Sequence, residues 1–260
     1  MTMSISRCTQ NPTFMEEWRK GWHPERMNAK GDSSSVLIIG AGPAGLEAAR
    51  ACAERGYDVA LAEAQSEIGG RVARERLLPG LSAWGRVVDY RAYQLSQKGN
   101  VETYLNSSLT ANDILQFGFE NIAIATGSNW RRDGVARQHV LPLPIHPALA
   151  LYTPDDLMAG NIPTGTVVLY DDDHYYMGGV LAELLVQNGA TVVLVTPSAY
   201  VSDWTNNTLE QASIHRKLAM MGVDIQLNRG VVAIGEDHVL TNCTYTDVTH
   251  PIPCDAIVMV

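Results

Sequence analysis

The chain has 260 residues, 46% of them hydrophobic, which is enough for two modest domains with apolar cores. Its formal net charge is −9, with no run of lysine and arginine, which argues against nucleic acid and anionic membranes as partners. No apolar run approaches the roughly 18 residues of a membrane span, and the N-terminus lacks the apolar core of a signal peptide, so we expect a cytoplasmic protein.

The residues before Ser33 are polar with embedded tryptophans and predict a connecting arm over 1–32. A first α/β series follows, and we assign it to a domain over 33–150. It alternates apolar strands with helices: strands at 36–40, 57–64, 101–105 and 121–127, and helices at 43–56 and 110–118.

The residues at 138–165 contain several prolines and predict an irregular crossover. A second series then begins, assigned to a domain over 151–260, with strands at 166–170, 191–196 and 223–228, helices at 177–189 and 207–222, and further strands at 231–235, 238–245 and 254–260. Two strand–helix–strand openings about 130 residues apart predict two Rossmann-like, doubly wound α/β domains. Because the chain ends on an apolar strand, we expect a piece of a longer polypeptide.

The first helix is preceded by a glycine-rich turn, Gly40-Ala41-Gly42-Pro43-Ala44-Gly45. Such a GxGxxG turn brings backbone N–H groups and a helix N-terminus to a diphosphate. Glu63 ends the next strand, where a carboxylate accepts hydrogen bonds from ribose hydroxyls and repels a 2′-phosphate. The pattern predicts an adenine-dinucleotide site that uses the backbone and side chains of Gly40, Ala41, Gly42, Ala44, Gly45 and Glu63.

Two further glycine-containing turns refine this site. Gly70 and Arg71 follow the Glu63 strand and place a small residue and a cation near the diphosphate, whereas Thr126 and Gly127 close a later strand. An ordinary glycine loop and an ordinary strand end are the alternatives. Together with the first turn, these residues favour a flavin-type adenylate site over an NAD site.

The second series opens differently, because Asp171, Asp172 and Asp173 stand where glycines are expected and only Gly178 and Gly179 remain at the helix start. A carboxylate about 5 Å from a phosphate, at an effective dielectric near 20, costs roughly 3 kcal/mol. We therefore expect a degenerate phosphate loop in an NAD(P)-like domain. The alternatives are a Mg²⁺ site built from the three aspartates and a solvated acidic turn with His174 exposed.

The four cysteines, Cys8, Cys52, Cys243 and Cys254, form no CxxC pair and no complete metal site. The last three lie in apolar helix or strand sequence and are expected to act as small hydrophobes. Cys8 lies in a polar segment.

Several motifs together resemble the trimethylamine dehydrogenase group of NADH:flavin oxidoreductases. They are CTQNP from Cys8, EEWR from Glu16, GWHPE from Gly21, VLIIGAGPAGLEAAR, and the later IGGR, LPGLSAW and ATG. The resemblance implies an FMN-binding barrel of the old yellow enzyme type, a [4Fe–4S] cluster and two nested dinucleotide-binding domains. It also implies that the barrel, and the C-terminal return that would complete the first dinucleotide domain, lie outside this chain.

The same resemblance implies that Cys8 is the last of four cluster ligands and that FAD or ADP fills the first dinucleotide site. No catalytic residue is expected in this chain. The implied function is the electron-transfer portion of an enzyme that oxidises a small N-methylated amine and passes electrons to an electron-transferring flavoprotein. The full-length protein is expected to be a homo-oligomer, and this chain alone inactive.

Two other functions stay open at this stage. One is an NAD(P)H-dependent enoate or 2,4-dienoyl-CoA reductase, which would need a nicotinamide site in the second domain. The other is a non-catalytic adenine-nucleotide-binding module, in which the nucleotide only stabilises the fold.

Overall fold

The computed structural model describes residues 8, 10–11, 14–15, 18 and 27–260. Most of the predicted arm over 1–32, including the EEWR and GWHPE motifs, lies outside these residues. The chain divides into two compact units, one with the described residues up to Leu77 and Leu81–Ser128, the other with Leu78–Gly80 and Asn129–Val260. No helix in the described part of the chain is long and apolar enough to cross a membrane.

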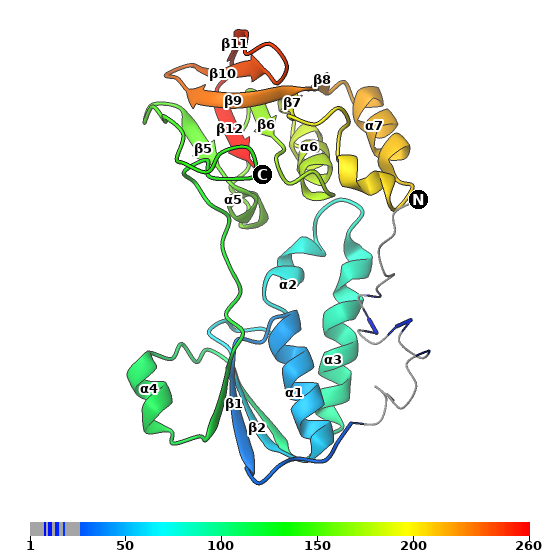
Figure 1. Cartoon of the computed structure of the whole chain (residues 1–260), viewed down its shortest axis with the longest axis vertical. Helices are drawn as coiled ribbons and strands as arrows, with labels where there is room; N and C mark the ends of the chain where they lie inside the picture. The colour runs from blue at the N-terminus through cyan, green and yellow to red at the C-terminus, as the bar shows by residue number, and fades with distance from the viewer. Residues whose placement is uncertain (1–7, 9, 12–13, 16–17, 19–26) are drawn as a thin grey trace. The chain divides into compact units, whose positions relative to one another are not determined.

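The first unit is a parallel four-stranded sheet in the order β3-β2-β1-β4. Its strands are β1 (Ser35–Ile39), β2 (Asp58–Ala62), β3 (Val101–Tyr104) and β4 (Asn121–Ile124). Its helices are α1 (Pro43–Arg55), α2 (Arg71–Glu75), α3 (Arg86–Ser96) and α4 (Ala111–Gln116), with a 3₁₀ turn η1 (Ser82–Gly85). Figure 1 shows α1 and α3 side by side along this sheet.

The core of the first unit lies between the sheet and these two helices. Leu46 and Ala49 of α1 pack with Ile38 of β1 and Leu61 of β2, and all four are almost fully buried. Burial of one leucine side chain of this kind contributes about 1.5–3 kcal/mol. Val88 and Leu95 bring α3 to the same core, although no helix was predicted over 86–96.

The second unit is a parallel five-stranded sheet with an antiparallel layer. The parallel sheet has the order β5-β12-β6-β7-β8 and the antiparallel layer the order β11-β10-β9. The parallel strands are β5 (Ala150–Tyr152), β6 (Thr166–Tyr170), β7 (Thr191–Val195), β8 (Asp224–Gln226) and β12 (Ala256–Met259), and the antiparallel strands are β9 (Arg229–Ile234), β10 (His238–Cys243) and β11 (Thr249–Pro253).

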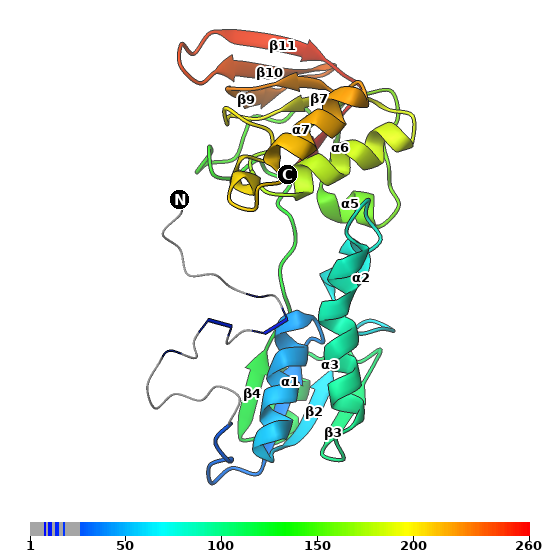
Figure 2. The ribbon, with the colours of Figure 1, turned by 90° about the vertical axis from the view of Figure 1, so that its right-hand side faces the viewer.

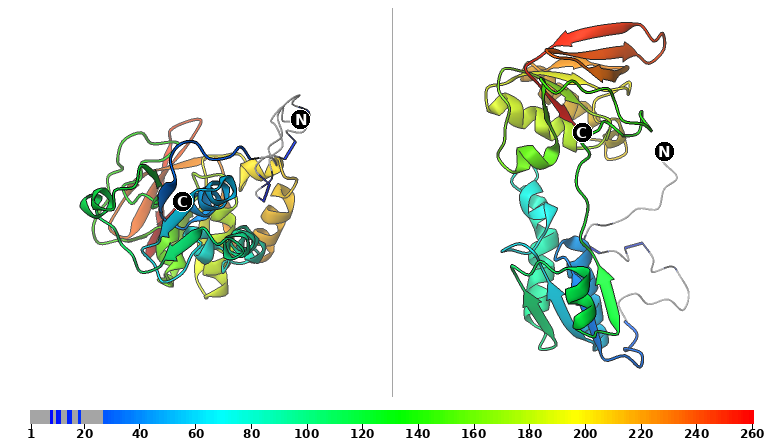
Figure 3. Two further views of the ribbon diagram at one scale, coloured as in Figure 1. Left: turned by 90° about the horizontal axis from the view of Figure 1, so that it is seen from below. Right: turned by 90° about the vertical axis from the view of Figure 1, so that its left-hand side faces the viewer.

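Helices α6 (Met177–Gln187) and α7 (Gln211–Met220) lie on one side of the parallel sheet, and the antiparallel layer lies on the other (Figure 2). The right-hand view of Figure 3 shows α6, in yellow-green, on the other side of the parallel sheet from the antiparallel strands, in orange to red. The larger apolar core fills the space between the sheet and the antiparallel layer, with Val168, Tyr170, Val193, Val231 and Ile257 among its members.

Three segments differ from the sequence expectation. The proline-rich crossover contains the edge strand β5 and the short helix α5 (Pro154–Met158). The helix expected over 207–222 is shorter and begins only at Gln211, because Leu209 takes a left-handed conformation, with φ +64°, after the 3₁₀ turn η2 (Asp203–Asn206). The division between the units falls after Ser128 rather than after 150, since Trp130 N–H donates to Asp155 Oδ2 at 2.8 Å within the second unit.

Candidate functional site

The parallel register of the first sheet assembles the predicted nucleotide-binding residues. Ile39 at the end of β1 pairs with Ala62 of β2 on one side and Ile124 of β4 on the other. The residues that follow these strands therefore meet at one edge of the sheet, which is where ligands bind in open α/β sheets. Gly40, Glu63 and the 125–127 turn lie at this edge.

Two glycines of the first turn are required by the protein's own packing. A Cβ at Gly40 would lie 2.4 Å from the carbonyl oxygen of Ala125, and the residue has φ +97°. A Cβ at Gly45 would lie 1.8 Å from the carbonyl oxygen of Gly40, because α1 begins directly against the end of β1. These two positions therefore admit only glycine, whatever the ligand.

Gly42 behaves differently. A Cβ there would meet only Gly70 Cα, at an ordinary 3.9 Å, and its φ of −71° suits any residue. The fold alone thus does not require glycine at position 42. A ligand that approaches the backbone at the start of α1 would require glycine at this position. A diphosphate bound at the helix N-terminus is such a ligand. Together with the glycine requirement at Gly40 and Gly45, this open position fits an adenine nucleotide.

Glu63 is buried and holds the turn in place. One carboxylate oxygen accepts from Ala41 N–H at 2.7 Å and the other from Gln65 N–H at 2.9 Å. Each oxygen of an ionised carboxylate keeps a further lone pair, so Glu63 is able to accept ribose hydroxyls as well. Sequence reasoning gave Glu63 only the ribose contact and missed its contact with Ala41.

The remaining predicted contact residues also lie around this turn. Gly69 N–H donates to the Ala41 carbonyl at 2.8 Å, which brings the loop before α2 onto the first turn. Arg71 donates to the Ser128 carbonyl and so joins the start of α2 to the end of the 125–127 turn. Thr126 and Gly127 are exposed, as is Ala44 in the first turn of α1.

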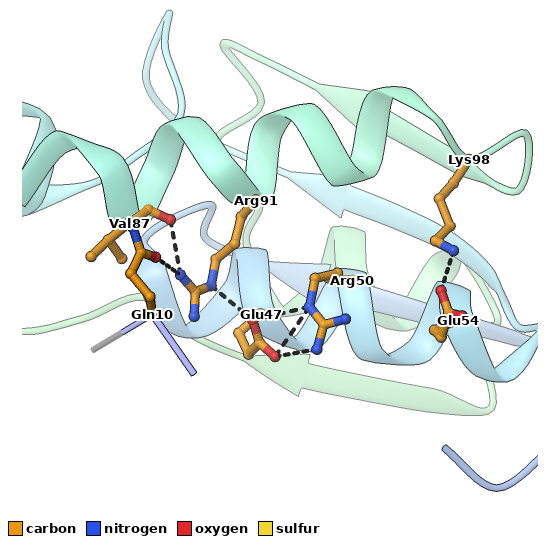
Figure 4. Close-up of polar contacts among 7 residues, drawn as sticks. All are labelled: Gln10, Glu47, Arg50, Glu54, Val87, Arg91 and Lys98. Atoms are coloured by element: carbon orange, nitrogen blue, oxygen red, sulfur yellow. Dashed lines mark hydrogen bonds and ion pairs between the residues drawn. The ribbon is translucent and has the colours of Figure 1, made fainter. Parts of the chain in front are cut away.

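A network of charges holds α1 against α3 one turn beyond the glycines (Figure 4). Arg91 of α3 is 4% exposed, and its Nε donates to Glu47 of α1 at 2.8 Å. Arg50 donates to the same carboxylate at 2.7 Å. The Arg91 Nη1 also lies 3.5 Å from Gln10 Oε1, which links this network to the segment that carries Cys8.

The surroundings of Cys8 suit a thiolate. Asn11 N–H donates to Cys8 Sγ at 3.4 Å, and this bond, with a second from the Gln10 backbone, lowers the pKa of the thiol. Thiolates are the ligands of iron–sulfur clusters. Among the described residues no three His, Cys, Asp or Glu side chains gather to hold a metal, so Cys8 fits as one ligand of a cluster and not as a site by itself.

The second turn is built without glycine and is closed by its own side chains. Tyr170 of β6 pairs with Val195 and Met259, so Asp171 follows the sheet at the position that Gly40 has in the first unit. The connection to α6 spans 171–176, compared with 40–42 before α1. A Cβ at Gly178 of α6 would lie 2.5 Å from Asp171 Cγ. The carboxylate of Asp171 therefore occupies the space between strand and helix.

The two alternatives for this turn are not supported by the structure. Asp171 and Asp172 are 0% and 1% exposed, and the side chain of His174 is 12% exposed, so the solvated turn with an exposed His174 is wrong. Asp172 faces His174 and Gln138 instead of solvent. The three aspartates form no metal-binding group in the described part of the chain.

Fold and first turn together define a protein of the dinucleotide-binding class with two α/β units. Comparisons with known proteins agree: residues 38–107 match the family model of an NAD(P)-binding Rossmann-like domain, and residues 152–247 match that of an OYE-like second alpha/beta domain. In sequence and fold the chain matches part of the proteins of the trimethylamine dehydrogenase-like group.

Three relatives carry this assignment. Histamine dehydrogenase from Rhizobium sp. 4-9 is 70% identical with a TM-score of 0.96, over 99% of this chain and 40% of that one. The 6-hydroxypseudooxynicotine amine oxidase from Pseudomonas geniculata N1 is 43% identical with a TM-score of 0.92, over 97% of this chain and 38% of that one. Dimethylamine dehydrogenase from Hyphomicrobium sp. (strain x) is 38% identical over 84% of this chain and 31% of its own length. The chain thus spans about a third of the curated relatives it matches.

Proposed function

We propose that this chain is the adenine-nucleotide-binding portion of an amine-oxidising flavoprotein dehydrogenase. The observation that carries the proposal is the first turn, where Gly42 is open in the protein alone while Gly40 and Gly45 are fixed by packing. The amine is proposed because relatives that are 70%, 43% and 38% identical are named for amine oxidation.

The proposed substrate is an amine of the histamine kind. The relative named for histamine is the most identical of the three, whereas relatives named for dimethylamine, dimethylglycine or N-methylproline are 28–38% identical. An N-methylated amine, which the sequence analysis expected, comes second. In either case oxidation of the C–N bond releases two electrons and two protons, and hydrolysis of the imine gives an aldehyde.

The residues of this chain would bind the nucleotide and position a cluster ligand. The backbone of Gly40–Gly45 and the start of α1 would hold the diphosphate, Glu63 the ribose, and Gly70, Arg71, Thr126 and Gly127 the far side of the turn. FAD contains an ADP moiety, so either ADP or FAD would satisfy these contacts. Cys8 would supply one thiolate to a [4Fe–4S] cluster, which transfers single electrons when bound. An electron-transferring flavoprotein is the proposed acceptor.

Thermal-shift measurements with ADP, FAD and NADP⁺ test the nucleotide site. ADP should stabilise the wild type, and NADP⁺ should do little because Glu63 opposes the 2′-phosphate. Gly42→Ala should keep the melting temperature of the nucleotide-free protein and weaken ADP about tenfold or more, because the new Cβ stands where the diphosphate approaches. Gly99→Ala is the matched control, since a Cβ there meets nothing within 4 Å. An unchanged ADP response in Gly42→Ala would refute the site.

A reductase fed by NADPH is the second candidate, since a relative that is 30% identical is named a multifunctional alkene reductase/demethylase. Rapid anaerobic mixing of the whole protein with NADPH or with histamine separates the two. Flavin bleaching by histamine, and not by NADPH, is the expected result. Cys8→Ser in the same protein should remove the cluster's visible absorbance while leaving ADP binding intact.

A further inference from the structure

Residues 136–139, here called the strap, close over the acidic turn of the second unit. Ala136 N–H donates to the His139 carbonyl at 2.9 Å, which makes the strap a tight turn. Gln138 N–H donates to Asp172 Oδ2 at 2.9 Å. Arg137 lies 3.8 Å from Asp173 and stacks over the Trp204 ring at 4.9 Å. The strap is therefore attached to the turn at both of its central residues.

Asp172 also anchors the turn to the sheet. Its backbone N–H donates to the Val260 carbonyl at 3.0 Å, and the preceding Asp171 N–H donates to the Val195 carbonyl at 2.8 Å. The strap is thus joined, through Asp172, to the carboxyl ends of β6 and β12, where the strand order reverses. In open α/β sheets this reversal is the place where ligands bind.

The ionisable side chain of His174 lies against the two buried carboxyl groups of Asp171 and Asp172. Its Nε2 lies 3.4 Å from Asp172 Oδ1, and its own backbone N–H donates to Asp171 Oδ1 at 3.0 Å. Its Nδ1 faces Thr196 Oγ1 at 3.4 Å. The other titratable or charged groups around the cluster are Arg137, Asp173 and the buried Tyr170, whose pKa is raised by burial and by the two aspartates.

The charge balance of this cluster changes when His174 gains or loses its proton. With His174 protonated, an imidazolium faces two buried carboxylates. With His174 neutral, the adjacent buried carboxyl groups of Asp171 and Asp172 lose the cation that faces them. Asp171 Oδ2 and Asp172 Oδ1 are buried and accept no hydrogen bond in the structure, so neither oxygen has another partner to replace it. Buried charge without a counter-charge is strongly unfavourable. Water reaches these oxygens only if a covering segment moves, and the strap is attached to Asp172.

We propose that the strap is a proton-controlled latch: protonated His174 compensates the buried carboxylate of Asp172 and so keeps the strap closed, and loss of this proton leaves that buried charge uncompensated and releases the strap. Release uncovers the carboxyl ends of β6 and β12. The inference concerns the second unit and is independent of the nucleotide site in the first.

The titration of the cluster supports this direction. Burial alone would lower the pKa of His174, but the contact with Asp172 and the charge of Asp171 outweigh it, so that this pKa is raised above its ordinary value. The proton of His174 is therefore lost at higher pH than that of an ordinary histidine, so the strap is expected to open as pH rises.

Hydrogen exchange of the full chain, followed by mass spectrometry and corrected for intrinsic rates, tests the latch at about pH 6 and about pH 8.5. In the wild type, protection of the Gln138 amide should fall about fivefold or more between these values. His174→Asn suits the left-handed backbone at this position, φ +64°, and cannot ionise. Its strap should exchange rapidly at both pH values. His238→Gln, at a surface ion pair with Asp237 in the same unit, should behave as wild type.

A second variant keeps the test decisive if His174→Asn does not fold. Asp172→Asn retains an oxygen for Gln138 N–H and removes the charge, so its strap should stay protected without pH dependence. Protection that is independent of pH in the wild type, or a wild-type pH dependence in either His174→Asn or Asp172→Asn, would overturn the proposal.

Discussion

The two units each join a parallel strand to a helix through a tight turn, but the first turn is built from glycines and the second from acidic residues. In the first unit the helix glycine Gly45 lies against the backbone of Gly40, and the space beside Gly42 stays open. In the second unit Gly178 lies against the side chain of Asp171, and Asp172 is covered by residue 138. The same βαβ architecture thus leaves one ligand position open and fills the other with its own side chains.

The largest effect is expected where helix and backbone meet most closely. Gly45→Ala would place a Cβ 1.8 Å from the Gly40 carbonyl oxygen, so that backbone atoms would have to shift. We expect a loss of more than about 4 kcal/mol of unfolding free energy, enough to unfold the first unit. Urea denaturation, with Gly99→Ala as the control, measures it. A variant as stable as wild type would show that the first turn is looser than described.

The second largest loss of unfolding free energy is expected in the charge network of Glu47, Arg50 and Arg91, which joins α1 to α3. Glu47→Gln leaves the buried Arg91 without its carboxylate and should cost about 3 kcal/mol. Arg91→Met should cost less, because Glu47 is partly exposed and keeps Arg50. The order of the two unfolding free energies is the test. Equal losses would mean that Arg91 and Glu47 act as an ordinary surface pair.

A double-mutant cycle checks whether Asp171 fills the second turn. Gly178→Ala alone should cost about 2 kcal/mol, because its Cβ would overlap the Asp171 side chain. In the background of Asp171→Gly most of this cost should vanish, which is a coupling that additive, distant sites do not show. Additive losses in the cycle would contradict the placement of Asp171 between β6 and α6.

The smallest predicted effect is on pH dependence. Burial raises the pKa of Asp171, and its carboxylate neighbours raise that of His174 despite burial. A group with a higher pKa in the folded state contributes stability that is full below its unfolded pKa and is lost as pH rises through its folded pKa. Both groups act in the same direction, so stability should fall by on the order of 1 kcal/mol from about pH 5 to about pH 8.

Asp171→Asn and His174→Asn should each flatten this slope, as measured by chemical denaturation at several pH values. The pKa values of Asp133 and Asp237 are lowered by Arg131 and His238, so these two groups change the unfolding free energy only at more acidic pH. Variants at these two positions are therefore the controls. A slope that is unchanged in both variants would place its origin elsewhere.

The sequence was sufficient to predict those strands and helices that are determined by short stretches of neighbouring residues. The strands before Gly40 and Asp171, and the helices that follow, are encoded by short apolar runs and glycines, and they were predicted. Helix α3 was missed because the charged Arg91 stands in its buried stripe, beside Val87 and Val88, while Tyr90 and Tyr93 are exposed apolar residues on its other face. The periodicity at 87, 88, 91 and 95 would have revealed it.

Contacts between residues far apart in the chain could not be predicted from the sequence. The burial of Asp172 depends on a backbone N–H at position 138 and on His174, which no local pattern shows. The boundary after Ser128 was missed for a similar reason, because Pro144 and Ile145 are typical of a linker and yet pair with Ile234 of β9. The second contact of Glu63, to Ala41 N–H, likewise appears only in the fold.

Titration calorimetry tests the central claim that one turn holds a nucleotide and the other is filled. ADP should bind once per chain, Gly42→Ala should remove that binding, Asp171→Gly should leave it unchanged, and NADPH should give no heat in any of them. Two ADP molecules per chain, or NADPH binding that survives Gly42→Ala, would contradict the account.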